Sequence, residues 1–186
     1  MNRKLIAIVC LIMLVALSGC GAGNSIPKGN GADAEGTAAA GDGSSADEQR
    51  KTATLYFGSE NADALVPEER EILVKGGETE EKVLFEELQK GPSGRGLPSP
   101  IPEGTRLLSA STEGDTCTID LSREFIDNHP GGSAGELMTI YSIVNTMTQL
   151  DNVKKVRFLI EGEKRDIFIH SELDAAFERD ESMIYK

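Results

Sequence analysis

The stretch "IYSIVNTMTQLDNVKKVRFLIEGE" (Ile140–Glu163) decides the fold, because a helix and a strand meet in it across a short turn. Apolar residues recur at helical spacing through its first part, and the predicted helix runs from about Ala134 to Gln149. Asp151-Asn152 then turns the chain. In "VKKVRFLIEG" (153–162) the apolar residues alternate, which predicts a strand with one buried face.

Further elements are predicted on both sides of this stretch. Strands are expected in "TATLYFGS" (52–59), "REILVK" (70–75), "TRLLSAST" (105–112), "TCTIDLS" (116–122) and "RDIFIH" (165–170), and a first helix in "GGETEEKVLFEELQKGP" (76–92). The order β-β-α-β-β-α-β-β predicts an α+β fold. We expect a small, mostly antiparallel sheet with two helices on one face.

The N-terminus has the pattern of an export signal. Arg3 and Lys4 precede an apolar run of about 13 residues, which is shorter than the roughly 20 residues that a membrane-spanning helix needs. Residues 1–19 are therefore predicted to be a signal peptide. It ends in "LSGC", which resembles the bacterial lipobox and makes Cys20 the expected lipidation site. The alternatives are an ordinary signal peptide with a chance cysteine and a short uncleaved anchor.

Between this cysteine and the first strand lies a segment of biased composition. Glycine, alanine, serine and aspartate dominate residues 20–50, and such a chain cannot bury enough apolar surface to offset the entropy lost on ordering. We predict a flexible tether that carries one domain, residues 51–186. The expected location is the extracytoplasmic face of the cell membrane, with lipid on Cys20 as the anchor.

Charge and cysteine content exclude several classes of protein. The formal net charge is −12, and no basic stripe is present, so nucleic-acid binding is not expected. Cys117 is the only cysteine in the predicted domain, so this domain forms no internal disulfide. Cys117 alternates with threonines in "TCTIDL", as expected of a small buried hydrophobe.

The segment "HPGGSAGEL" (His129–Leu137) raises the question of catalysis, because it contains the pattern G-x-S-x-G around Ser133. A nucleophile elbow needs a strand directly before the serine, and "REFIDNHPG" reads as a loop. Ser133 also lies three residues before Glu136, which is the spacing of a capping box at the start of a helix. We predict a structural helix cap at Ser133 and Glu136, with no catalytic residue.

No other catalytic, cofactor or metal site is predicted. The sequence has no phosphate-binding loop, no dinucleotide fingerprint and no zinc or calcium motif. His129 and His170 are the only histidines, and with Cys117 they are too scattered to indicate a zinc site. The glutamates at 68–71 and 78–81 are expected to be solvated faces. The protein is therefore expected not to be an enzyme and to need no cofactor.

The chain from Leu55 to about Ser182 resembles the GerMN domain of sporulation and spore germination proteins. The stretches that carry the resemblance are "LYF", "LVPEERE", "VLFEELQKGP", "GLPSPIPEGTRLLS", "CTIDLSREF", "GGSAGEL", "IYSIVNTMTQLDNVKKVRFLIEGE" and "FERDES". The resemblance implies an envelope lipoprotein of a Gram-positive bacterium and a fold similar to ring-building-motif modules. Sporulation lipoproteins of the family carry two copies, whereas this chain has room for one.

Together these observations predict a lipid-anchored, non-enzymatic interaction or assembly module of the cell envelope, in sporulation or germination. The expected partner is another envelope protein or a second copy of the chain. A sheet edge, the polar sheet face or the loop of residues 93–105 would provide the contact. The alternative is a protein that binds an envelope ligand, such as a glycan or a small germination signal. With no Trp and only three Tyr, the chain is poorly equipped for stacking on sugars.

Overall fold

The computed structural model describes residues 48–94 and 97–186. The predicted signal peptide, Cys20 and the tether up to residue 47 lie outside the described residues. The first strand already begins at Glu48. Residues 48–50, which the sequence placed in the tether, are therefore part of the folded domain.

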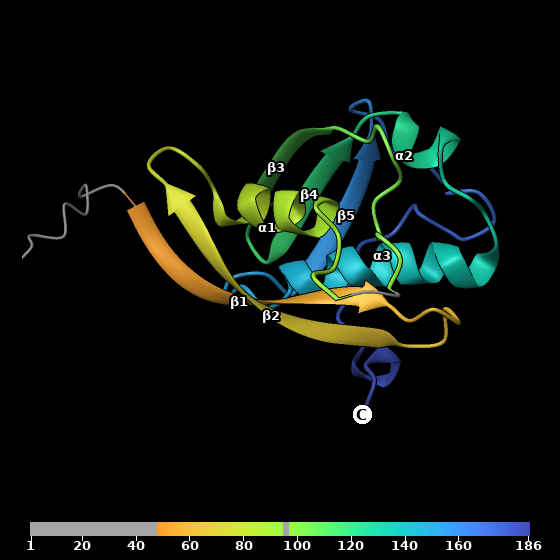
Figure 1. Cartoon of the computed structure of the whole chain (residues 1–186). Helices are drawn as coiled ribbons and strands as arrows, with labels where there is room; N and C mark the ends of the chain where they lie inside the picture. The colour runs from red at the N-terminus through yellow and green to blue at the C-terminus, as the bar shows by residue number, and fades with distance from the viewer. Residues whose placement is uncertain (1–47, 95–96) are drawn as a thin grey trace, which may run out of the picture. The chain divides into compact units, whose positions relative to one another are not determined.

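Two sheets and three helices make up the domain (Figure 1). The elements are β1 (Glu48–Gly58), β2 (Leu65–Lys75), α1 (Glu80–Gln89), β3 (Leu107–Glu113), β4 (Thr116–Leu121), α2 (Glu124–Asp127), α3 (Ser133–Met147), β5 (Lys155–Ile160) and β6 (Phe177–Glu178), followed by a 3-10 turn at Glu181–Met183. β1 and β2 form an antiparallel hairpin, and the second sheet has the order β3-β4-β5-β6. The α+β class is confirmed.

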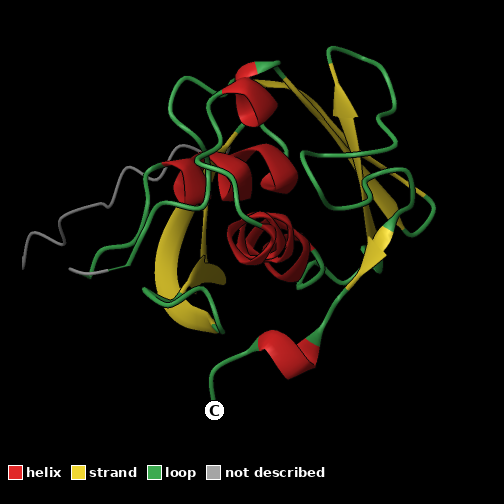
Figure 2. Ribbon diagram, turned by 90° about the vertical axis from the view of Figure 1, so that its right-hand side faces the viewer, coloured by secondary structure: helices red, strands yellow, loops and turns green. Residues whose placement is uncertain are grey.

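The expectation of a single sheet with helices on one face is wrong, because α3 lies between the two sheets. Figure 2 shows α3 nearly end-on, with the β1–β2 hairpin on one side and the four-stranded sheet on the other. Ten of its 15 residues are buried, so α3 has no continuous solvent face. A helix that is buried on most of its surface needs packing partners on more than one side. The hairpin and the sheet provide them.

The four-stranded sheet has a parallel centre. β4 and β5 pair in parallel, and the connection between them runs through α2 and α3, as a parallel pair requires a long crossover. The two outer strands pair antiparallel with their neighbours, β3 with β4 and β6 with β5. The alternation predicted for β4 is confirmed, since Cys117, Ile119 and Leu121 are all fully buried toward the helices.

The strand predicted at residues 165–170 is wrong. This segment consists of bends and one isolated bridge between Ile167 and Glu172, and β5 pairs instead with the two residues of β6. The segment turns back on itself, since Phe168 N donates to Ser171 O and Leu173 N to Asp166 O, and the N–H groups of His170 and Ser171 donate to the Glu136 carboxylate of α3. The Glu136 side chain thus accepts hydrogen bonds from two backbone N–H groups that could otherwise donate to a neighbouring strand.

Side chains of α3 and the following turn also close the outer edge of β1. The Gln149 amide accepts a hydrogen bond from Thr54 N at 2.8 Å and donates one to Thr54 O at 2.6 Å, as a neighbouring strand would. Thr146 Oγ1 accepts from Tyr56 N at 3.2 Å. The hairpin is joined to the central helix through these three bonds as well as by its apolar face.

The C-terminal tail crosses from the sheet back to the hairpin. Asn145 of α3 donates to Asp180 O at 2.9 Å and accepts from Asp180 N at 3.1 Å. The Arg179 guanidinium lies over the Tyr56 ring, 4.9 Å from its centroid, and donates to the Tyr56 hydroxyl. Tyr185 N then donates to Leu65 O at 2.8 Å. The tail therefore connects both sheets across α3.

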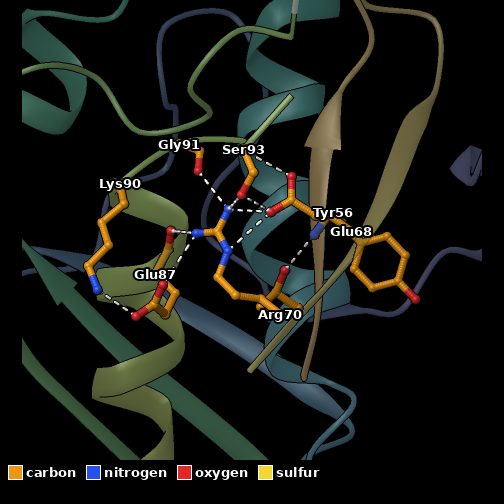
Figure 3. A network of polar contacts seen from close by, with 8 residues as sticks. Tyr56, Glu68, Arg70, Glu87, Lys90, Gly91 and Ser93 are labelled. Carbon is orange, nitrogen blue, oxygen red and sulfur yellow. Dashed lines mark hydrogen bonds and ion pairs between the residues drawn. The ribbon is translucent and has the colours of Figure 1, made fainter. Parts of the chain in front are cut away.

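Arg70 of β2 joins the hairpin to α1 (Figure 3). Its guanidinium donates to the Glu87 backbone carbonyl and to Gly91 O, each at 3.0 Å, near the C-terminal end of α1, where carbonyl groups lack helical partners. It also forms ion pairs with Glu68 and Glu87. Only 16% of the Arg70 side chain is exposed, so these bonds form in a partly dry environment.

Replacing Arg70 by lysine should destabilise the domain. Lysine has a single compact ammonium and cannot present the planar fork that reaches both the helix end and Glu68, so we expect Arg70→Lys to lower the free energy of unfolding by about 2–4 kcal/mol. Urea denaturation of the full chain would measure it. Arg50→Lys is the matched control, because the Arg50–Glu71 pair on the same hairpin is 73% and 66% exposed and should contribute about 0.5 kcal/mol or less. Equal effects of the two substitutions would contradict this role of Arg70.

Candidate functional site

The segment around Ser133 is the start of α3, and the structure supports neither the predicted helix cap nor the nucleophile that the sequence pattern also raised. α3 begins at Ser133, its N-cap is Gly132 with φ 84°, and no side-chain cap hydrogen bond is formed. The predicted capping box is wrong, because Glu136 is directed away from the helix end. The glycine conformation, which other residues rarely adopt, turns the chain into the helix instead.

The nucleophile elbow is absent as well. β4 ends at Leu121, and α2 and a loop separate it from Ser133, so no strand leads into the serine. Within residues 48–94 and 97–186, no histidine nitrogen makes a hydrogen bond to the Ser133 hydroxyl. Ser133 is exposed on the surface without the general base that serine catalysis needs.

Glu136 is the most deeply buried charged residue that the sequence singled out. Its exposed fraction is 0%. Oε2 accepts hydrogen bonds from His170 N and Ser171 N, both at 2.9 Å, and Oε1 lies 2.7 Å from His170 Nδ1. Burial alone would raise the pKa of Glu136, but the hydrogen bonds from His170 and Ser171 outweigh it and lower the pKa to about 2. Glu136 is thus an ionised structural group.

His129 is held in one tautomer by its neighbours. Nδ1 accepts from Gly131 N at 2.9 Å, so the ring proton lies on Nε2, which donates to Thr139 Oγ1 at 3.0 Å. The ring meets Phe168 edge-on, with 5.0 Å between centroids. Burial lowers the pKa of His129, and the nearby Glu136 opposes that shift. Both ring nitrogens are therefore occupied in holding the loop before α3.

The other candidate residues are also used by the fold. Cys117 is fully buried, and burial raises its pKa to about 11, so it is an unreactive thiol. The glutamates at 78–81 do not converge: Glu78 pairs with Lys82, Glu80 with Lys51, and Glu81 accepts from Thr112. The described part of the chain contains no cluster of three or more metal-ligating side chains.

An apolar groove lies beside the start of α3. Its walls are residues 98–102 of the loop after α1, His129 and Pro130 before α3, and Gly58 at the end of β1, with Met138 among them. The depression has a volume of about 180 Å³. It shares Ser99, Pro102 and Pro130 with a wider, more open depression. The sequence offered this loop as one of three alternative contact surfaces, and in the structure it forms one wall of a groove.

The described residues thus form an α+β module whose buried polar groups maintain its own architecture. The model of the Germane family, described as sporulation and spore germination, matches residues 54–166. The chain belongs to this family, the family of GerMN domains.

Solved structures agree with this assignment. A crystal structure described as "Putative Lipoprotein from Clostridium perfringens" is 26% identical, with a TM-score of 0.50, and the match covers 71% of this chain and 88% of that one. The tandem GerMN domains of the sporulation protein GerM from Bacillus subtilis match with 21% identity and a TM-score of 0.57. That match covers 80% of this chain and 51% of that chain, so the present chain spans about half of the tandem protein.

Curated sequences and the helices of the described residues add two findings on the chain. No curated protein sequence matches it. Among the helices that the structure describes, none is long and apolar enough to cross a membrane.

Substitutions at Ser133 and Glu136 should have very different effects. Ser133→Ala removes no cap hydrogen bond, so the free energy of unfolding should change by about 0.5 kcal/mol or less. Glu136→Ala leaves the His170 and Ser171 N–H groups without an acceptor and should cost roughly 3 kcal/mol. Denaturant unfolding would measure both, with the exposed Glu172→Ala as control. If Ser133→Ala lowered the free energy of unfolding more than Glu136→Ala does, the result would support the capping box and contradict the structure.

Stability should fall with acidification in two steps. The folded state lowers the pKa of His129 below its ordinary 6.5, so the stability that depends on the neutral ring is complete above about pH 6.5 and is lost as the pH falls through the lowered value. Glu136 adds a second loss, which begins below about pH 4.5 and continues toward pH 2. Denaturant titrations across this range would detect both. His129→Gln should remove the first loss and keep the second, and an unchanged profile would contradict the assignment.

Proposed function

We propose that this protein is a lipid-anchored, non-enzymatic module of the bacterial cell envelope that binds another protein during sporulation or spore germination. The observation that carries the proposal is the use of the reactive groups. His129, His170 and Glu136 all hold segments of the fold together, and Ser133 has no base. An exposed apolar groove remains beside them, which suits binding rather than chemistry.

The anchor is part of the proposal. Lipid on Cys20 would hold the mature chain at the extracytoplasmic face of the membrane, since two or three acyl chains bind far more firmly than one. The lipoprotein description of the structure from Clostridium perfringens supports this. Roughly 30 residues of tether would place the domain within about 30 Å of the surface on average.

A different protein is a better partner than a second copy. A net charge of −12 makes copies of the chain repel one another. The edge of β1 is closed by Gln149 and Thr146, and the β2 edge carries Pro67, Glu69 and Glu71, which hinder strand pairing. β3 offers a short edge that a register shift between Leu107 and Ser109 interrupts.

The alternative function, binding of a glycan or small signal, has less support from the groove. Sites for small ligands usually enclose about 300–1,000 Å³. The apolar groove, at about 180 Å³, has room for one side chain.

Crosslinking in intact sporulating cells would test the proposal. We expect the native chain to be crosslinked chiefly to one other envelope protein, and mass spectrometry would identify it. Cys20→Ala should abolish both the membrane association and the crosslinked product. Capture of the chain alone would overturn the interaction proposal, whereas crosslinks chiefly between copies would favour self-assembly.

A further inference from the structure

The groove beside α3 has a definite chemistry. We propose that it binds a segment of a partner protein in which one apolar side chain is flanked by lysine or arginine. This inference rests on the proposed function and specifies its contact surface. We call the depression formed by residues 98–102, His129, Pro130, Gly58 and Met138 the proline groove.

The floor of the proline groove depends on a close approach of two elements. A Cβ atom on Gly58 would lie 3.1 Å from Met138 Cβ, which is tighter than ordinary packing, so a larger residue would require Met138 to shift by a few tenths of an ångström. The Met138 thioether adapts well to different apolar partners. With prolines on its walls, the groove forms an apolar pocket that can hold one side chain.

The walls are fixed before any partner binds. Proline rings restrict the backbone at Pro98, Pro100 and Pro102. The end of the loop is held by two side chains, since Gln89 donates to Thr105 O at 2.5 Å and Asn128 donates to Glu103 O at 2.7 Å. Binding to a preformed groove avoids the entropy cost of ordering it, so even a short segment can gain useful affinity.

Exposed carboxylates outnumber basic groups around the groove. The three segments that form it, residues 58–64, 97–105 and 124–139, contain Glu60, Asp63, Glu103, Glu124, Asp127 and Glu136. They contain no lysine or arginine, but the exposed Arg106 and Arg123 directly adjoin residues 105 and 124. Glu136 is buried and paired, while Glu60, Asp63, Glu103 and Asp127 are exposed. His129 adds no positive charge near neutral pH, because burial lowers its pKa.

This charge pattern identifies the occupant. Exposed carboxylates around an apolar seat attract a segment with basic residues on both sides of an apolar one and repel acidic segments. The same carboxylates disfavour an anionic membrane surface. They also disfavour a second copy of this acidic chain. Gly58, the last of the 11 residues of β1, lines the groove, so the whole strand separates the groove from Glu48, where the proposed tether would end.

A peptide selection would test the proposal directly. The probe is a random dodecapeptide library displayed on phage, panned on the full chain in neutral detergent. We expect the selected peptides to carry Leu, Ile, Phe or Met next to Lys or Arg. Ser99→Trp places a large ring in the groove from an exposed position and should weaken the best peptide by about tenfold or more. Ser111→Trp, on exposed β3, is the matched control and should bind as the parent chain does.

The charges would be tested separately. Glu103→Lys should weaken the same peptide by about three- to tenfold and reduce the salt dependence of its affinity. Glu113→Lys makes the same charge change at the exposed end of β3 and should have no effect.

Selection of acidic or uncharged peptides would overturn the inference. So would the absence of any peptide that distinguishes the parent chain from Ser99→Trp. If crosslinking in cells captures a partner and Ser99→Trp does not reduce that capture, the groove proposal fails while the proposed function stands. Capture of the chain alone would instead remove the proposed function itself.

Discussion

The structure depends on one constraint, which is that α3 is buried along most of its length. A buried polar side chain costs free energy unless it forms a hydrogen bond within the protein, and of the buried polar side chains on α3 only the Ser142 hydroxyl forms none. Glu136 forms hydrogen bonds with the backbone of residues 170–171, Thr139 with the His129 ring, and Asn145 with the backbone of Asp180. Each of these bonds draws an irregular segment onto the helix. The loops and the tail of this domain are thus arranged by the polar residues of its core.

Local sequence patterns predicted many of the individual strands and helices but not how they are arranged in two sheets. The alternation in β4 and β5 and the helical spacing after Ser133 are local signals, so both strands and α3 could be recognised. The division into two sheets depends on which strands pair, and pairing between distant segments leaves no local period. The strand expected at 165–170 failed for the same reason, since the competitor for its backbone is a side chain of α3, 34 residues away for His170.

The candidate site was misread at Glu136 for a specific physical reason. Ser133 and Glu136 have capping-box spacing, and the same spacing also arises when an acidic residue lies on the apolar stripe of a helix. Glu136 is followed at helical intervals by Ile140, Ile143 and Met147, all fully buried. That register was visible in the sequence and indicated a buried carboxylate. The groove, in contrast, joins three distant segments and has no signature beyond their shared acidity.

The length of β1 has a mechanical consequence. The strand runs from Glu48, where the proposed tether would end, to Gly58 in the proline groove, a distance of about 33 Å at the usual rise per residue. A pulling force between the membrane and a partner in the groove would therefore act along this strand. The hydrogen bonds that join β1 to β2 lie across that direction and would share the load in shear, instead of opening one after another. A domain that links two moving surfaces of a cell envelope would gain resistance to rupture from this geometry.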